Sequence, residues 1–245
     1  EQTAQAPKKR ELALVSRSTY IKEKALQWIF FACAFLAVVT VILIFVFTTY
    51  SALPVFTDIG LADFFGFTWA PSEGHYGIMS LLAGSGLVTV GALAMGVPLG
   101  VGTAVYLVEI ASKRVCKLIS PAVDLLAGIP SVVYGLVGMI ILVPGIQKAF
   151  GLSSGACLLA AILVLAIMIL PSIISVSETA LRAVPEDYEQ ASLALGATHL
   201  ETVFRVTVPA ARSGVATAIV LGVGRAIGEA MAIIMVAGNV ANMPG

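Results

Sequence analysis

The chain has 245 residues, of which 59% are hydrophobic and only 11% are charged, with 14 basic and 14 acidic side chains. Soluble domains usually carry about 25% charged residues, so this composition excludes an ordinary soluble enzyme. The zero net charge gives no basis for nucleic-acid binding. Long uncharged runs without strict alternation favour a helical membrane protein over a β-barrel. The three cysteines show no CxxC or Cys/His spacing, so neither a disulfide framework nor a zinc site is indicated by them.

The N-terminal segment, residues 1–24, is polar enough to lie in the cytoplasm. Residues 1–10 are predicted to form a disordered tail. Residues 11–24 mix apolar and basic side chains, which fits an amphipathic helix on the inner leaflet or a frayed tail equally well.

Five apolar runs follow, each long enough to cross a membrane as a helix, which takes about 20 residues. The predicted spans are 25–50, 77–108, 119–146, 155–176 and 213–240. Glycine and proline lie inside the second span (Gly96, Pro98) and the third (Gly128, Pro130), so a kink or a break is expected in each.

The basic residues predict the orientation of these spans. Twelve of the 14 Lys and Arg residues fall in the N-terminal segment, the loop 113–117 and the loop 177–212. The alternate segments hold only Lys148, and the positive-inside rule therefore places the N-terminus and the loop 177–212 in the cytoplasm.

The stretch from Glu189 to Pro209 is polar although apolar runs flank it on both sides. It is predicted to form two short helices broken at Gly196 and closed by Pro209. A compact helical hairpin at a membrane surface is expected to be a docking element. Elsewhere near this surface, Glu109 lies four residues before Lys113, which predicts a local ion pair.

Two ionisable residues, Arg225 and Glu229, lie inside the fifth predicted span. They are four residues apart, so a continuous helix would place them on one face. One interpretation is a helix-internal salt bridge that neutralises both. The other makes Arg225 a ligand for a tetrahedral oxyanion, with Glu229 holding the guanidinium in place. In the third span, Ser131 and Tyr134 follow the Gly-Ile-Pro break, where they either line a polar path or belong to a packing kink.

The loop motif resembles that of permease subunits of ABC importers. Gln190-Ala191-Ser192 stands at the place of the family's E-A-A motif, with Gln190 in place of the acidic residue and Glu189 one position earlier. Gly196 follows, and nine further residues precede Val206-Thr207-Val208-Pro209. The resemblance implies that the loop seats in a groove of a cytoplasmic ATPase. By position, the docking residues are Glu189, Gln190, Ala191, Gly196, Ala197, His199 and Pro209.

Four further motifs resemble the phosphate transport system family of permeases, in its PstC-like form. They are the run Gly128–Gly135, the runs Ile169–Ile174 and Ser177–Pro185 that lead into the docking loop, and Arg225-Ala226-Ile227-Gly228-Glu229. The resemblance implies that Arg225, Glu229, Ser131 and Tyr134 belong to the phosphate path.

The family also implies a fold and a set of partners. The expected fold is an all-α integral membrane protein of the type I ABC importer permease class, with five spans visible of an expected six. The expected partners are a second, PstA-like permease, two cytoplasmic ATPase subunits, an extracytoplasmic phosphate-binding protein and membrane lipid, in the bacterial inner membrane. The chain itself is expected to be no enzyme and to hold no cofactor, because ATP and Mg would bind to the ATPase.

Three alternatives remain open on the sequence. A permease for another oxyanion, such as sulfate or molybdate, need not carry the 225–229 motif. A passive channel subunit would have no need of the docking hairpin. A membrane hydrolase would rest on the G-x-S-x-G match at 151–155 alone. Replacing Ser153 with Ala would then abolish its activity, whereas we expect the replacement to leave transport unchanged.

Overall fold

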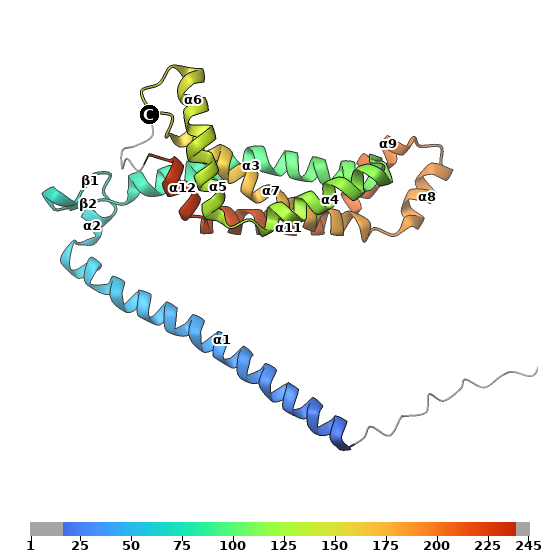
Figure 1. The fold of residues 1–245 in the computed structure, drawn as a ribbon, viewed down its shortest axis with the longest axis horizontal. Coiled ribbons are helices and arrows are strands. Elements are labelled where there is room, and N and C mark those ends of the chain that lie inside the picture. The colour runs from blue at the N-terminus through green and yellow to red at the C-terminus, as the bar shows by residue number, and fades with distance from the viewer. Residues whose placement is uncertain (1–16, 239–245) are drawn as a thin grey trace, which may run out of the picture. The chain divides into compact units, whose positions relative to one another are not determined.

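The structure is a computed structural model that describes residues 17–238 (Figure 1). The chain forms two compact units, and the boundary between them in the sequence lies between Phe64 and Phe65. The first unit holds the helices α1 (Arg17–Asp58) and α2 (Leu61–Phe64). The first predicted span lies within α1, and the N-terminal segment from residue 17 onward is its first part rather than a separate amphipathic helix. The prediction for residues 1–16 lies outside the described residues.

The second unit begins with a short β-hairpin. Strands β1 (Trp69–Ala70) and β2 (His75–Tyr76) pair antiparallel around the 3₁₀ turn η1 (Pro71–Glu73). The rings of Trp69 and Tyr76 meet edge to face, with centroids 6.2 Å apart, which is the preferred arrangement of such a pair.

Helices α3 (Met79–Val105) and α7 (Leu158–Arg182) form the centre of the second unit and pack along each other. Of the kink or break expected at Gly96 and Pro98, the break does not occur, because α3 continues through both residues to the π-helical segment η2 (Tyr106–Ile110). Gly96 serves packing instead: a Cβ atom there would lie 2.7 Å from the Cδ1 atom of Ile169 on α7.

The predicted third span is divided at the expected break. Helix α4 (Lys113–Gly128) ends there, and the chain is extended at Ile129 and Pro130 before α5 (Ser131–Val137) begins. The π-helical segment η3 (Gly138–Leu142) and α6 (Val143–Phe150) continue from α5. The membrane-length helix is therefore 131–150 rather than 119–146. The predicted loop 113–117 is likewise wrong, because those residues form the start of α4.

The predicted loop 177–212 begins later than expected, because α7 continues to Arg182. It contains α8 (Glu186–Ala194) and then an uninterrupted helical run. That run comprises α9 (His199–Thr202), the π-helical segment η4 (Val203–Thr207) and α10 (Val208–Ala210).

The predicted fifth span is also divided. It consists of α11 (Arg212–Gly228) and α12 (Met231–Val236), with Glu229 in an extended conformation between them. Residues 239 and 240 lie outside the described part of the chain.

Within residues 17–238, four helical stretches are long and apolar enough to cross a membrane: 22–55, 79–110, 131–150 and 158–182. A fifth candidate is the run 199–210 followed by α11, which are bent by 68° relative to each other. The core of the second unit lies along α7, whose side chains Leu165, Ile169 and Ile173 are fully buried. At one end of this unit lie α5, α6 and α12, and at the other end lie α8 and α9 (Figure 1).

Candidate functional site

Arg225 is held inside the helix bundle by a residue from a distant helix. Its Nη1 atom donates a hydrogen bond of 2.8 Å to the Oγ atom of Ser172 on α7. Tyr134 on α5 does not share this hydrogen bond, because its hydroxyl donates to the carbonyl oxygen of Leu126 at 2.8 Å. Arg225, Ser172 and Tyr134 are all half-buried.

Glu229 does not pair with Arg225 in the described part of the chain, and the expected shared helix face is wrong. The helix ends at Gly228, and the extended conformation of Glu229 turns its side chain onto the start of α12. There the Oε1 atom accepts a hydrogen bond of 3.0 Å from the backbone N–H of Ala232. A carboxylate at a helix N-terminus is stabilised by the helix dipole and by the free N–H groups. Glu229 therefore caps a helix.

The chain has one break at 129–130 and another at 229–230, and the helices that follow these breaks pack against each other. Helix α5 follows the first break, α12 follows the second, and the two helices are in direct contact. A Cβ atom at Gly135 would lie 2.8 Å from the Cα atom of Ala232, so only glycine permits this approach. Ser131 begins α5 and is half-buried, and among the described residues the hydrogen bond of Arg225 goes to Ser172 rather than to Ser131.

The hairpin of α8 and α9 confirms the predicted break at Gly196, where φ is +91°. Ser192 and Thr202 join its two arms through a hydrogen bond of 2.8 Å between their hydroxyl oxygens. Pro209 does not close the second helix, which continues to Ala210. The wide π turn of η4 precedes Pro209 and accommodates a residue that has no N–H to donate.

The second arm begins with a capping box. The hydroxyl of Thr198 accepts a hydrogen bond from the N–H of Glu201, and the backbone N–H of Thr198 donates to the Glu201 carboxylate. The backbone N–H and the hydroxyl of Thr198 both donate to the Glu201 carboxylate, and they lower the pKa of Glu201 because they stabilise its ionised form. The cap is therefore complete at neutral pH and is weakened only as the pH falls through this lowered pKa.

The hairpin is anchored through its second arm, whereas its first arm, α8, has no buried residue. Val203 is 1% exposed and packs with Leu181 at the end of α7 and with Ala104 on α3.

The predicted docking residues are mostly outward-facing. Gln190, Ala191, Gly196, His199 and Pro209 are exposed, and Glu189 and Ala197 are half-buried.

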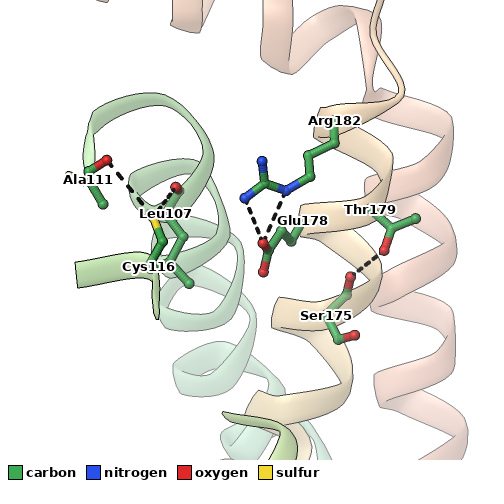
Figure 2. Close-up of polar contacts among 7 residues, drawn as sticks. All are labelled: Leu107, Ala111, Cys116, Ser175, Glu178, Thr179 and Arg182. Carbon is green, nitrogen blue, oxygen red and sulfur yellow. Dashed lines mark hydrogen bonds and ion pairs between the residues drawn. The ribbon is translucent and has the colours of Figure 1, made fainter. Parts of the chain in front are cut away.

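Glu109 is a residue whose role the sequence did not indicate. Its partner among the described residues is His199, whose Nε2 atom lies 4.0 Å from Oε2 of Glu109, rather than the predicted Lys113. His199 also lies 3.6 Å from Oε1 of Glu189. No sequence signal would have found this cluster, because α3 and the hairpin are distant in the chain. Figure 2 shows that the neighbouring Arg182 is engaged elsewhere, with its guanidinium bonded to Glu178 on its own helix.

The described helices place a half-buried arginine between α11 and α7 and anchor the α8–α9 hairpin at the ends of α3 and α7. The family of inner membrane components of binding-protein-dependent transport systems matches residues 96–244. The chain belongs to this family of ABC transporter permeases, whose members are transport subunits and not themselves catalysts. The all-α permease fold expected from the sequence is thereby confirmed.

Named relatives agree with this assignment. A probable ABC transporter permease protein of Bacillus subtilis, YqgH, is 39% identical over 218 residues, which cover 87% of this chain and 71% of YqgH. The phosphate transport system permease protein PstC of Haemophilus influenzae is 37% identical over 196 residues. That match covers 72% of this chain and 62% of PstC, so the chain spans less than two thirds of this relative. An inward-facing structure of the MetNI methionine ABC transporter matches 62% of this chain and 68% of its own, at 25% identity and a TM-score of 0.48.

Proposed function

We propose that this chain is one permease subunit of an ATP-driven importer that carries inorganic phosphate across the bacterial inner membrane. The observation that carries the proposal is the hydrogen bond from Arg225 to Ser172. Within residues 17–238, no carboxylate oxygen lies within 4.0 Å of the Arg225 guanidinium. A neutral partner leaves the positive charge available for an anion, and the planar guanidinium fork suits a tetrahedral oxyanion.

The choice of phosphate rests on two supports. Several relatives are named phosphate transport system permeases, and the 225–229 motif resembles that of the same family. The name of YqgH gives no substrate. Another oxyanion, such as sulfate or molybdate, is the second candidate, since the same guanidinium would attract it.

The hairpin of α8 and α9 is proposed to dock on a cytoplasmic ATPase subunit. Its surface exposes large apolar side chains that a solvated loop does not need. They are Tyr188, Leu193, Leu195, Leu200 and Phe204. Large apolar side chains exposed on an otherwise polar loop are typical of a protein contact surface. Two ATPase subunits would bind ATP and Mg, a second, PstA-like permease would complete the pathway, and an external phosphate-binding protein would deliver the ion.

The anchored arm of the hairpin connects the proposed ATPase-docking surface mechanically to the ends of α3 and α7. Val203 and Ala211 are buried against α3 and α7, so a displacement of the hairpin moves the ends of those helices. Closure of the ATPase dimer would thus change the packing around Arg225 and expose its side chain alternately to either face. A passive channel would need neither the exposed hairpin surface nor its buried anchor.

Uptake by the purified complex tests both parts of the proposal. The chain, its partner permease and its ATPase are reconstituted with the binding protein in vesicles, and labelled phosphate uptake is measured with and without ATP. We expect ATP-dependent uptake that unlabelled phosphate abolishes and that sulfate and molybdate leave unchanged. Competition by sulfate instead would assign the other oxyanion, and uptake independent of ATP would show a channel.

A further inference from the structure

Three potential metal ligands meet where the hairpin approaches the end of α3. They are the carboxylates of Glu109 on η2 and Glu189 on α8 and the imidazole of His199 on α9. One ligand atom from each lies within 4.8 Å of the other two. The three residues come from three separate elements, so a ligand held among them would link those elements.

The two carboxylates lack a permanent positive partner. Within residues 17–238, no Lys or Arg nitrogen lies within 4.0 Å of either one, and the nearby Arg182 is bonded to Glu178 at 2.9 Å (Figure 2). The side chain of Glu109 is only 8% exposed and accepts no hydrogen bond among the described residues. Glu109 and Glu189 both line a cavity of about 230 Å³, and His199 approaches the two carboxylates from outside its lining. Burying a carboxylate beside a second one without a cation is costly.

We propose that Glu109, Glu189 and His199 bind a divalent transition-metal cation of the zinc class, which clamps the α8–α9 hairpin to the end of α3. Imidazole nitrogen together with carboxylate oxygen is a donor set that suits Zn²⁺, whereas Mg²⁺ and Ca²⁺ take oxygen ligands. Three protein ligands leave the fourth tetrahedral position for water. Tetrahedral Zn²⁺ holds its ligand atoms about 3.4 Å apart, and His199 lies 3.6 Å from the Glu189 carboxylate and 4.0 Å from that of Glu109.

The proposed metal site does not depend on which ion the protein transports. The test of zinc binding and the test of phosphate transport can therefore fail independently of each other. Its consequence would be mechanical. The exposed arm of the hairpin, α8, is otherwise joined to α9 through the Ser192–Thr202 hydrogen bond, and a bound cation would add a direct link from α8 to η2.

Zinc binding to the purified, tag-free complex tests the proposal. Competition with a chromophoric chelator measures the affinity and the number of Zn²⁺ ions for the wild type, His199→Gln and Glu109→Gln. The chain has only two histidines, so His75→Gln is the matched control for the imidazole, and Glu186→Gln, which lines the same cavity, is the control for the carboxylates. X-ray absorption at the zinc edge identifies the ligand atoms.

The expected result is one Zn²⁺ per permease chain that both ligand variants lose, with an affinity at least about 100-fold weaker, while both controls keep it. The zinc-edge spectrum should show only nitrogen and oxygen ligands at about 2.0–2.2 Å. Equal binding by wild type and His199→Gln, loss in His75→Gln, a sulfur ligand, or no saturable binding at all would each overturn the proposal. His199 is 47% exposed, so its replacement should not disturb folding.

Discussion

Arg225 donates a hydrogen bond of 2.8 Å to Ser172, a residue 53 positions away, and not to Glu229, four positions away. The chain break at Glu229 explains this choice, because it turns the carboxylate toward the N-terminus of α12. The break therefore separates a positive charge from the acid that would have neutralised it. If the protein carries an anion as proposed, this separation keeps the guanidinium available to the ion.

Replacing Ser172 tests whether the hydroxyl positions the guanidinium. Ser172→Ala should lower phosphate uptake about tenfold, since a hydrogen bond to a charged group contributes about 1.5–3 kcal/mol. Ser172→Thr, which keeps a hydroxyl, should retain most of the uptake. Ser153→Ala, in the loop after α6, is the matched control and should leave uptake unchanged. Equal uptake by the two Ser172 variants would show that the hydroxyl has no positioning role.

Gly135 permits the contact of α5 with α12. Gly135→Ala should lower the stability of the complex by about 1–3 kcal/mol, because the new methyl group would overlap the backbone of Ala232. Thermal unfolding in detergent measures the change. The control is Gly128→Ala, since a Cβ atom there meets nothing within 4 Å. A melting temperature that falls equally in both variants would contradict the packing account.

Gly196 has a backbone conformation that other residues avoid. Gly196→Ala should destabilise the hairpin by about 1–2 kcal/mol because φ is +91°. We expect less ATPase to copurify with this variant. Gly102→Ala on α3, where the added Cβ meets nothing within 4 Å, should keep the ATPase and slightly raise the stability. Unchanged ATPase recovery with Gly196→Ala would indicate that the turn is not part of the docking surface.

The hydrogen bond between Ser192 and Thr202 holds the two arms of the hairpin together. Because Thr202 is 1% exposed, water cannot replace the lost partner easily. A double-mutant cycle with Ser192→Ala and Thr202→Val should give a coupling energy of about 0.5–1.5 kcal/mol in thermal unfolding. Strictly additive effects would show that the two hydroxyls do not interact in the assembled protein.

The local features of the fold could be predicted from the sequence. The break at Gly196 and the one at Pro130 follow from what glycine and proline permit in a helix. The role of α4 could not be predicted, because its apolar residues run on into those after Pro130 and look like a single span. The 225–229 motif does not indicate that the helix ends at Gly228, because glycine is common inside membrane helices.

The tertiary partners could not be predicted for a different reason. Ser172 and Glu109 each meet a residue far along the chain, and a hydroxyl or a carboxylate on a helix does not specify which distant helix will pack beside it. Local spacing favoured Glu229 for Arg225 and Lys113 for Glu109. Tertiary packing gives both residues other partners. Arg225 pairs with Ser172 because the helix breaks after Gly228, and Glu109 lies beside His199 because the hairpin approaches η2.

The most direct test of the account is phosphate uptake by cells carrying Arg225→Gln, with complex assembly and binding-protein levels measured alongside. Arg212→Gln, an exposed arginine at the start of the same helix, is the matched control. The account predicts that Arg225→Gln assembles with its partners and loses at least about 99% of uptake, that Arg225→Lys recovers only part of it, and that Arg212→Gln transports normally. Normal uptake by an assembled Arg225→Gln complex would contradict the assignment of Arg225 to the phosphate path.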